Sequence, residues 1–597
     1  MFRPRLCLML LLSCTVFLAP RCGAEDPSAQ PQSTQSKAAE MPPPAILKTF
    51  TNMVNLEVVV KDRKGNHLTG LKPEDFQLFE QTPAKSKEKH QQKIASFHEV
   101  SVAALARQAG GAVQAPAGTY TNAIAARKDP VPPTILLVDG LNTEVQYQLQ
   151  IHAQSVKMLA QLPSDVPVAV YLLGFKLEML QDFTSDPKLL QATVKQAVST
   201  AGHGFAQTDP RGDSSMPASS SSQVTAPSSG ETRSNKSKDP APDLSGPWRD
   251  LFQGLDGYQT AIYRGQMEVR VRLTADALVA IAQHMSGYPG RKNLLWLSTA
   301  FPICIDPAMD TTHTHVYNRR IESVANALSD AKIAVYPINP AGVRPPAVST
   351  FDASAPGVER MAQLVYALNR ELDTMQLMAD GTGGEVCTGD NDVADCVHRS
   401  VDDSSHFYEI AYYPDSKDWN GEYRRIVLSA KNKDWHLEYR QGYFATPEEN
   451  GKATDVRAAL KHAACEGPLD ATSILLSART LPPDTPDALK FDLDIAASSL
   501  TFTPTGSGGG EVNLQLAVCT FDEKGKPGQF MSIPLNRKLT ESETRQAAAD
   551  GLQDIAAVPG PRPASLRLAV MDVPSGRLGS ISIKADGLAA TSRAGAQ

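Results

Sequence analysis

The sequence lacks a strong net charge, and it lacks the short signatures of common enzymes. Its 58 basic and 65 acidic residues give a formal net charge of −7 over 597 residues, which argues against a general nucleic-acid-binding protein. It has no nucleophile elbow, no phosphate-binding Walker loop and no catalytic cysteine–histidine signature. We therefore expect a protein that is not an enzyme and does not bind nucleic acid.

Long apolar runs are also missing beyond the N-terminus, so no transmembrane segment is expected there. At the N-terminus itself, Arg3 and Arg5 precede an apolar run from Leu6 to Ala19. Small residues lead up to Ala24, which is typical of a secretory signal peptide over residues 1–24. The alternative is a membrane anchor, for which the run is short. We expect an exported protein, whether periplasmic, secreted or bound to the cell surface.

Cysteines are few, and five remain after cleavage of the predicted signal peptide. Cys387 and Cys396 flank a short polar loop, and export provides an oxidising compartment, so we predict a disulfide between them. Cys465 and Cys519 form a second candidate pair, which leaves Cys304 unpaired. The alternative is that all five are reduced and buried as small hydrophobic residues.

The first ordered part of the chain is predicted to be a β module over residues 50–105, after a disordered leader at 25–49. Val54, Leu56 and Val58 alternate with polar residues, which is the period of a strand buried on one face. Further short strand candidates follow, and together they indicate a small antiparallel sandwich.

Residues 130–446 have a different pattern, in which apolar runs alternate with helical segments. Ile135 to Val138 is a continuous apolar run of the kind found in strands buried on both faces of a parallel sheet. Repeated alternation of strand and helix predicts an α/β domain with helices on both faces. A stretch rich in Ser and Pro at about 206–246 is predicted to be a disordered insertion. A linker at 447–470 and a second β-sandwich at 471–590 are expected to follow.

Several segments of this central region resemble the von Willebrand factor A domain, and specifically the bacterial VWFA-related proteins of Acidobacteria. They occur in a fixed order: Pro133 to Thr143, Gly287 to Ser298, Ala334 to Gly342, Ala379 to Gly384, Phe407 to Pro414 and Tyr439 to Tyr443. The resemblance implies a doubly wound α/β sheet flanked by β modules and a role in binding or adhesion.

The resemblance also implies a metal-ion-dependent adhesion site at the carboxyl edge of the sheet. Asp139 matches the first aspartate of that site, Thr143 matches its second hydroxyl, and Thr274 is the candidate for the threonine of its second loop. Such a site holds Mg²⁺ or Mn²⁺ through oxygen donors.

The match to that metal site is incomplete. Leu141 stands where the first hydroxyl is expected, and the third loop, Ser298 to Ala300, lacks the usual aspartate. Asn142 could supply an oxygen instead. In the simpler interpretation Asp139 caps the helix that follows it, and no metal is bound.

Two further groups of residues are candidate sites. His313 and His315 could bind zinc, but their spacing matches no zinc motif, and a polar surface loop is the simpler interpretation. A tyrosine cluster could be a recognition surface, although strand packing explains most of its positions. Its members are Tyr408, Tyr412, Tyr413, Tyr439 and Tyr443.

The sequence thus predicts an exported, non-catalytic, adhesion-type protein that recognises a protein or cell-envelope partner through an A-like domain. The alternatives are a zinc-dependent hydrolase that uses the His313/His315 loop and a purely structural envelope component. The A-like domain itself is expected to carry a weakened divalent-metal site.

Overall fold

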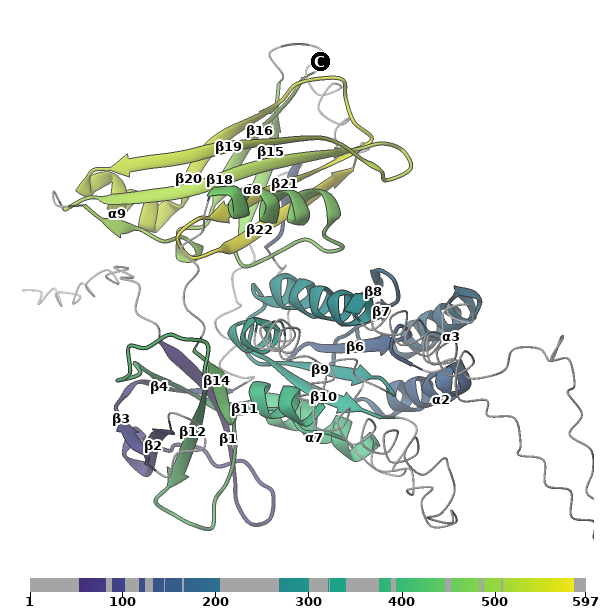
Figure 1. Cartoon of the computed structure of the whole chain (residues 1–597), viewed down its shortest axis with the longest axis vertical. Helices are drawn as coiled ribbons and strands as arrows, with labels where there is room; N and C mark the ends of the chain where they lie inside the picture. The colour runs from purple at the N-terminus through teal and green to yellow at the C-terminus, as the bar shows by residue number, and fades with distance from the viewer. Residues whose placement is uncertain are drawn as a thin grey trace, which may run out of the picture. The chain divides into compact units, whose positions relative to one another are not determined.

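The computed structural model describes most of the chain between residues 53 and 584, all of it within one compact unit, Leu47–Gln597 (Figure 1). The described ranges are 53–81, 88–101, 118–123, 132–143, 145–163, 166–204, 268–299, 320, 323–339, 375–387, 393–445, 453–482, 485, 488–505 and 508–584. Six sequence predictions lie outside them: the signal peptide at 1–24, the leader at 25–49, the insertion at about 206–246, Cys304, His313 and His315.

The N-terminal β-sandwich is built from two groups of strands that are far apart in the sequence. One sheet has the order β13-β1-β11-β4, and the other has the order β14-β12-β2-β3. The bounds of the early strands are β1 Val54–Lys61, β2 Phe76–Gln81, β3 His90–Gln92 and β4 Ile94–Ser101, with a 3-10 turn η1 at Pro73–Asp75. Those of the late strands are β11 His406–Tyr412, β12 Tyr423–Ala430, β13 His436–Glu438 and β14 Gly442–Phe444.

This pairing differs from the expected domain boundaries, which placed the late strands with the central domain. β1 pairs with β11 from Val54↔Tyr412 to Val58↔Tyr408, and β12 pairs with β2. The physical reason is burial: the alternating apolar residues of both groups share a single core, which includes Leu56, Val58 and Ile410. Neither group alone has enough strands to enclose that core. The α/β domain is therefore inserted within the sandwich.

The central domain contains a five-stranded sheet with the order β10-β9-β6-β7-β8. β6 is parallel to β7 and to β9, β9 is parallel to β10, and only β8 runs antiparallel to its neighbour. The bounds are β6 Thr134–Asp139, β7 Val168–Leu173, β8 Leu177–Thr184, β9 Lys292–Leu297 and β10 Ile333–Ile338. Every residue of β6, β7, β9 and β10 is buried, as their apolar runs predict.

Helices cover both faces of this sheet, and successive side chains of each strand therefore enter two different cores. Ile135 and Leu137 belong to one core, and Leu136 and Val138 belong to the other. The described helices are α2 Val145–Gln161, α3 Pro187–Gly204 and α7 Val393–Ser405, with helical segments at 268–285, 323–330 and 375–382. The sequence after Gly384 indicates β structure, but the structure places the helix α7 there before β11 begins at His406.

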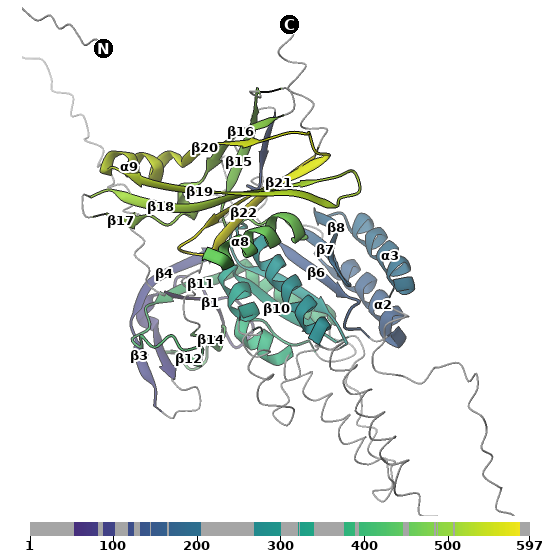
Figure 2. The ribbon, with the colours of Figure 1, turned by 45° about the horizontal axis from the view of Figure 1, so that its top comes forward.

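The C-terminal module consists of two further antiparallel sheets (Figure 2), with the orders β20-β16-β15-β5 and β17-β18-β21-β22. In the second sheet β19 pairs with β18 to form a long ribbon. The bounds are β5 Thr119–Thr121, β15 Leu476–Leu481, β16 Leu489–Ile495, β17 Thr503–Pro504, β18 Gly510–Phe521, β19 Pro527–Leu539, β20 Leu552–Val558, β21 Ser565–Asp572 and β22 Arg577–Lys584. The remaining elements are α8 Ala453–Lys461, the π-helix η3 His462–Glu466, the 3-10 turn η4 Ala497–Ser499 and α9 Glu541–Asp550.

In the described part of the chain, disulfides join Cys387 to Cys396 and Cys465 to Cys519, with Cα–Cα distances of 6.0 and 5.4 Å. Cys387 forms a parallel bridge with Ile338 at the end of β10, and Cys396 lies in α7. The first disulfide therefore ties α7 to the edge of the parallel sheet. Within the described part of the chain, no helix is long and apolar enough to span a bilayer.

Candidate functional site

The candidate site lies at the carboxyl edge of the parallel sheet, where β6 ends at Asp139. The loop after this residue turns sharply, because the backbone N–H groups of Gly140 and Leu141 both donate to the carbonyl of Leu173, each at 2.9 Å. Leu173 is the last residue of β7, so the loop is fixed to the neighbouring strand end. This anchoring holds the Asp139 carboxylate inside the domain, where its residue is fully buried.

The Asp139 carboxylate accepts hydrogen bonds from Asn142 and Trp296. The backbone N–H of Asn142 donates to Oδ1 at 2.9 Å, and the Asn142 side-chain amide donates to Oδ2 at 2.8 Å. The Trp296 indole N–H, from β9, donates to the same Oδ2 at 3.0 Å. Burial raises the pKa of Asp139, and the bonds from Asn142 and Trp296 and the charge of Arg270 offset only part of that rise.

The structure brings the three predicted metal ligands together: Thr143 bonds directly to Asp139, and Asn142 joins Asp139 to Thr274. Thr143 donates its hydroxyl to the Asp139 backbone carbonyl. The Thr274 hydroxyl, from the helical segment 268–285, accepts a hydrogen bond from the Asn142 amide at 2.8 Å. Arg270, one turn earlier in that segment, donates to Asn142 Oδ1 at 3.3 Å. Asn142 is thus the centre of the cluster, and it contributes a nitrogen rather than the oxygen considered from the sequence.

This donor set does not fit Mg²⁺ or Mn²⁺. Mg²⁺ needs near-octahedral oxygen ligands at about 2.0–2.1 Å. Here Asp139 Oδ2 already accepts two N–H groups, and an NH₂ group lies between that oxygen and the hydroxyl of Thr274. Leu141 supplies no oxygen from its side chain. The bonds from Asn142 to the Asp139 carboxylate lie within the loop that precedes α2, so this carboxylate stabilises the loop.

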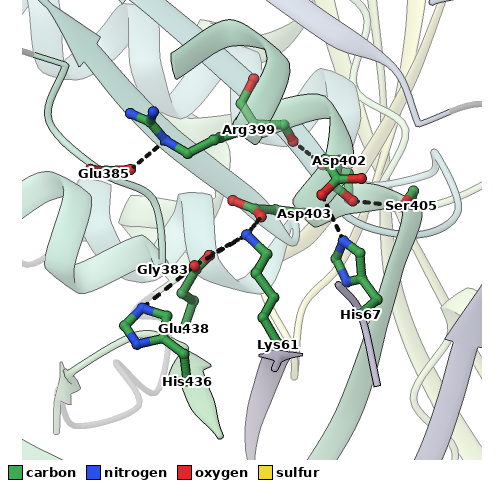
Figure 3. Close-up of polar contacts among 12 residues, drawn as sticks. Lys61, His67, Gly383, Glu385, Arg399, Asp402, Asp403, Ser405, His436 and Glu438 are labelled. Atoms are coloured by element: carbon green, nitrogen blue, oxygen red, sulfur yellow. Dashed lines mark hydrogen bonds and ion pairs between the residues drawn. The ribbon is translucent and has the colours of Figure 1, made fainter. Parts of the chain in front are cut away.

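A second polar cluster joins α7 to the N-terminal sandwich (Figure 3). His67, Asp402 and Asp403 bring potential ligand atoms within 4.8 Å of one another. Lys61 Nζ, however, lies 2.5 Å from Asp403 and 3.2 Å from Glu438, and His67 Nε2 lies 2.9 Å from Asp402. Although burial acts to lower the pKa of Lys61, the charges of Asp403 and Glu438 raise it. A cation would have to displace this ammonium group, so the cluster is an ion-pair network.

Toward the amino edge of the same sheet, four of the six segments on which the resemblance rests come together. Arg291 is buried and donates to the carbonyl of Gly383 at 2.6 Å and to the hydroxyl of Tyr336 at 3.3 Å. The N–H of Gln441 donates to the carbonyl of Asp380 at 2.8 Å. Four of the matching segments are therefore hydrogen-bonded to one another here. Their role at this edge is structural.

Lys292, next to Arg291, is also fully buried and donates to the carbonyl of Tyr288 at 2.8 Å. Burial lowers its pKa to about 7, with a smaller contribution from the charge of Lys332. Gly384 is equally constrained, because a Cβ added there would lie 2.0 Å from the carbonyl oxygen of Val335. This edge of the domain thus tolerates little change in side-chain size.

The tyrosine cluster is mainly part of the sandwich core. Tyr408, Tyr412 and Tyr443 are buried. The hydroxyls of Tyr412 and Tyr443 donate to Glu80 at 3.1 and 3.3 Å, and Glu80 pairs with buried Arg424 at 3.4 Å. Because most of these rings lie inside the protein, packing explains the cluster, and a recognition surface does not.

Comparison with known proteins identifies no family for the chain. No protein-family model matches the sequence, and no curated protein matches it. Among solved structures, an aerotolerance-related membrane protein from Bacteroides fragilis matches with 9% identity and a TM-score of 0.22, covering 45% of this chain and 98% of its own. BatB from Bacteroides thetaiotaomicron matches with 9% identity and a TM-score of 0.20, covering 45% and 97%.

A third structure, the pilus adhesin SpaC from Lactobacillus rhamnosus GG, has 8% identity and a TM-score of 0.21 and covers 87% of this chain and 58% of its own. Likenesses at this level define neither a fold nor a function for the chain. The geometry of the site therefore has to carry the functional argument.

Proposed function

We propose that this chain is an exported, non-catalytic binding protein whose von Willebrand factor A-like domain recognises a protein partner through the carboxyl edge of its parallel sheet. The observation that carries this proposal is the position of Asp139. The chain order β6, β7, β8 runs outward on one side of β6, and β9 and β10 then continue on the other side. Asp139 therefore ends the strand at which the winding direction changes.

In open α/β sheets, ligands bind outside the carboxyl ends of strands at such a switch point. The loop after β6 and the segment 268–285 meet there, joined by the Asn142–Thr274 hydrogen bond. Val269, in the same segment, is 39% exposed, and Arg270 is half-buried beside Asn142. A binding surface at this edge would thus combine an apolar side chain with a positive charge.

The test uses site-specific photocrosslinking in the mature protein, with and without Mg²⁺. A photoreactive amino acid replaces Val269 at the proposed edge or, as the control, Ile533 on β19, which is 52% exposed. After exposure to an envelope fraction, we expect one specific crosslinked protein from position 269 and none from position 533. Crosslinking only from position 533 would place binding on the C-terminal module, and none from either position would favour a purely structural role.

A further inference from the structure

The side-chain amide of Asn142 lies between two of the predicted metal ligands, Asp139 and Thr274. Its nitrogen donates to Asp139 Oδ2 and to Thr274 Oγ1, each at 2.8 Å. An NH₂ group has two hydrogens, so both are used. The oxygen of the amide accepts from Arg270 at 3.3 Å. Exchanging the nitrogen and oxygen would set the oxygen against a carboxylate and the nitrogen against a guanidinium, so this network fixes the orientation of the amide.

The other potential ligands are already engaged in ways that leave no place for a cation between them. Trp296 donates to Asp139 Oδ2 at 3.0 Å, and Asn142 N–H donates to Oδ1 at 2.9 Å. Thr143 directs its hydroxyl to the backbone carbonyl of Asp139. N–H donors and a nearby guanidinium thus satisfy the buried carboxylate, which otherwise would be costly to hold inside the domain.

We infer that Asn142 replaces the divalent cation, so that the carboxyl edge of this domain is held in shape without Mg²⁺ or Mn²⁺. The inference rests on the proposed function only in that it concerns the same edge. It predicts that any partner binds equally well in the presence of a chelator. Its direct test is metal binding, which does not require the partner to be known, so its failure is distinct from a failure of the proposed function.

The experiment measures Mn²⁺ binding by the electron paramagnetic resonance signal of free Mn²⁺, together with melting temperature in chelator and in millimolar Mn²⁺. Any Mn²⁺ that the wild-type protein binds should be unaffected by Asp139→Asn. Its melting temperature should be the same in chelator and in millimolar Mn²⁺. Asn142→Asp places a second carboxylate beside Asp139. This variant should melt several degrees lower in chelator, because two buried carboxylates repel each other, and should recover with about one bound Mn²⁺.

The control is the double variant Asn142→Asp, Asp139→Asn, which again has one carboxylate and should lose the added Mn²⁺ site. Wild-type binding of Mn²⁺ that Asp139→Asn abolishes would overturn the inference, and this comparison decides the matter even if Asn142→Asp does not fold. A folded Asn142→Asp protein that binds no Mn²⁺ would also overturn it, because Asn142 would then not be the group that excludes the cation.

Discussion

The two edges of the β10-β9-β6-β7-β8 sheet both bury charged groups, but they satisfy them differently. At the amino edge, Arg291 and Lys292 donate to backbone carbonyls of Gly383 and Tyr288. At the carboxyl edge, the acidic group of Asp139 accepts from side chains and from the N–H of its own loop. The first arrangement fastens one chain segment to another, whereas the second positions a loop. Matching segments therefore lie at both edges, and those at the amino edge hold the domain together.

The largest loss of stability is expected from a substitution that disturbs backbone packing at the amino edge. Gly384→Ala would place its Cβ 2.0 Å from the carbonyl oxygen of Val335. Since both are backbone atoms that cannot move independently, we expect a loss of more than about 4 kcal/mol in the free energy of unfolding. Gly381→Ala is the matched control, because its Cβ would meet only Ala325 at 3.6 Å. Denaturant unfolding of the two variants measures the difference, and equal losses would refute the structural role.

At the carboxyl edge, Asp139→Ala is expected to cost less, about 2–4 kcal/mol, because it leaves the Trp296 indole N–H and the Asn142 amide without an acceptor. Asp139→Asn keeps an oxygen acceptor of nearly the same shape and should lose clearly less. Thermal and denaturant unfolding in chelator and in Mg²⁺ should give the same loss for each variant. A loss that appears only with Mg²⁺ would show that the cation contributes to stability.

Removing the disulfide beside the parallel sheet should cause a smaller loss in the free energy of unfolding. Replacing Cys387 and Cys396 by serine should lower the free energy of unfolding by about 2–3 kcal/mol, since the closed loop is short, with a sequence separation of 9. Mass mapping of the non-reduced, alkylated protein made in an oxidising compartment should find both cysteines in one linked pair of peptides. A Cys387 peptide found alkylated and alone would contradict the pairing.

At the amino edge, the titration of Lys292 should make the free energy of unfolding depend on pH. Its pKa is about 7 in the folded protein and 10.5 for the unperturbed side chain, so between these values the unfolded chain binds a proton that the folded protein does not. Stability is therefore lost as pH falls through this window, and the penalty is fully present below pH 7. Lys292→Met should stabilise the protein by about 2–3 kcal/mol near pH 7, and should destabilise it by about 1–2 kcal/mol above pH 10.5, where only the loss of the hydrogen bond to Tyr288 remains.

A second substitution checks the cause of that effect. Because the charge of Lys332 contributes to the lowered pKa of Lys292, Lys332→Met should flatten the dependence of wild-type stability on pH across the same window. Melting temperatures measured at several pH values compare the three proteins. If Lys292→Met gives the same gain at every pH, its effect comes from packing and not from titration.

The parallel strands could be predicted from the sequence because their burial on both faces leaves continuous apolar runs, as in Ile135 to Val138. The helix α7 could not, because it is rich in Asp and Ser, which favour turns and caps over helix interiors. Its buried residues include Cys396, Val397 and Ser400. They can be recognised as one buried face only when the position of the parallel sheet against which α7 packs is known.

The candidate site was predictable in its first residue, but neither in the groups that bond to that residue nor in its organisation. Asp139 and Thr143 follow a strand directly, so their position at the sheet edge follows from the sequence. Asn142 was considered as an oxygen donor, yet its bond to Thr274 joins residues 132 positions apart. Trp296 and Arg270 carried no local signal, because their roles depend on how β9 and the segment 268–285 pack around the loop.

The insertion of the α/β domain has a consequence for the order in which the chain can fold during its synthesis. Among the described residues, β2 and β3 are the only two of the first four strands that pair with each other, and β1 and β4 pair with strands that follow the inserted domain. Lys61 meets its partner Asp403 only after 342 further residues. At typical ribosomal rates this interval is on the order of 20–70 s. The strands that are synthesised first thus find their pairing partners late. Until the second half of the chain has emerged, their exposed edges need protection from wrong pairing.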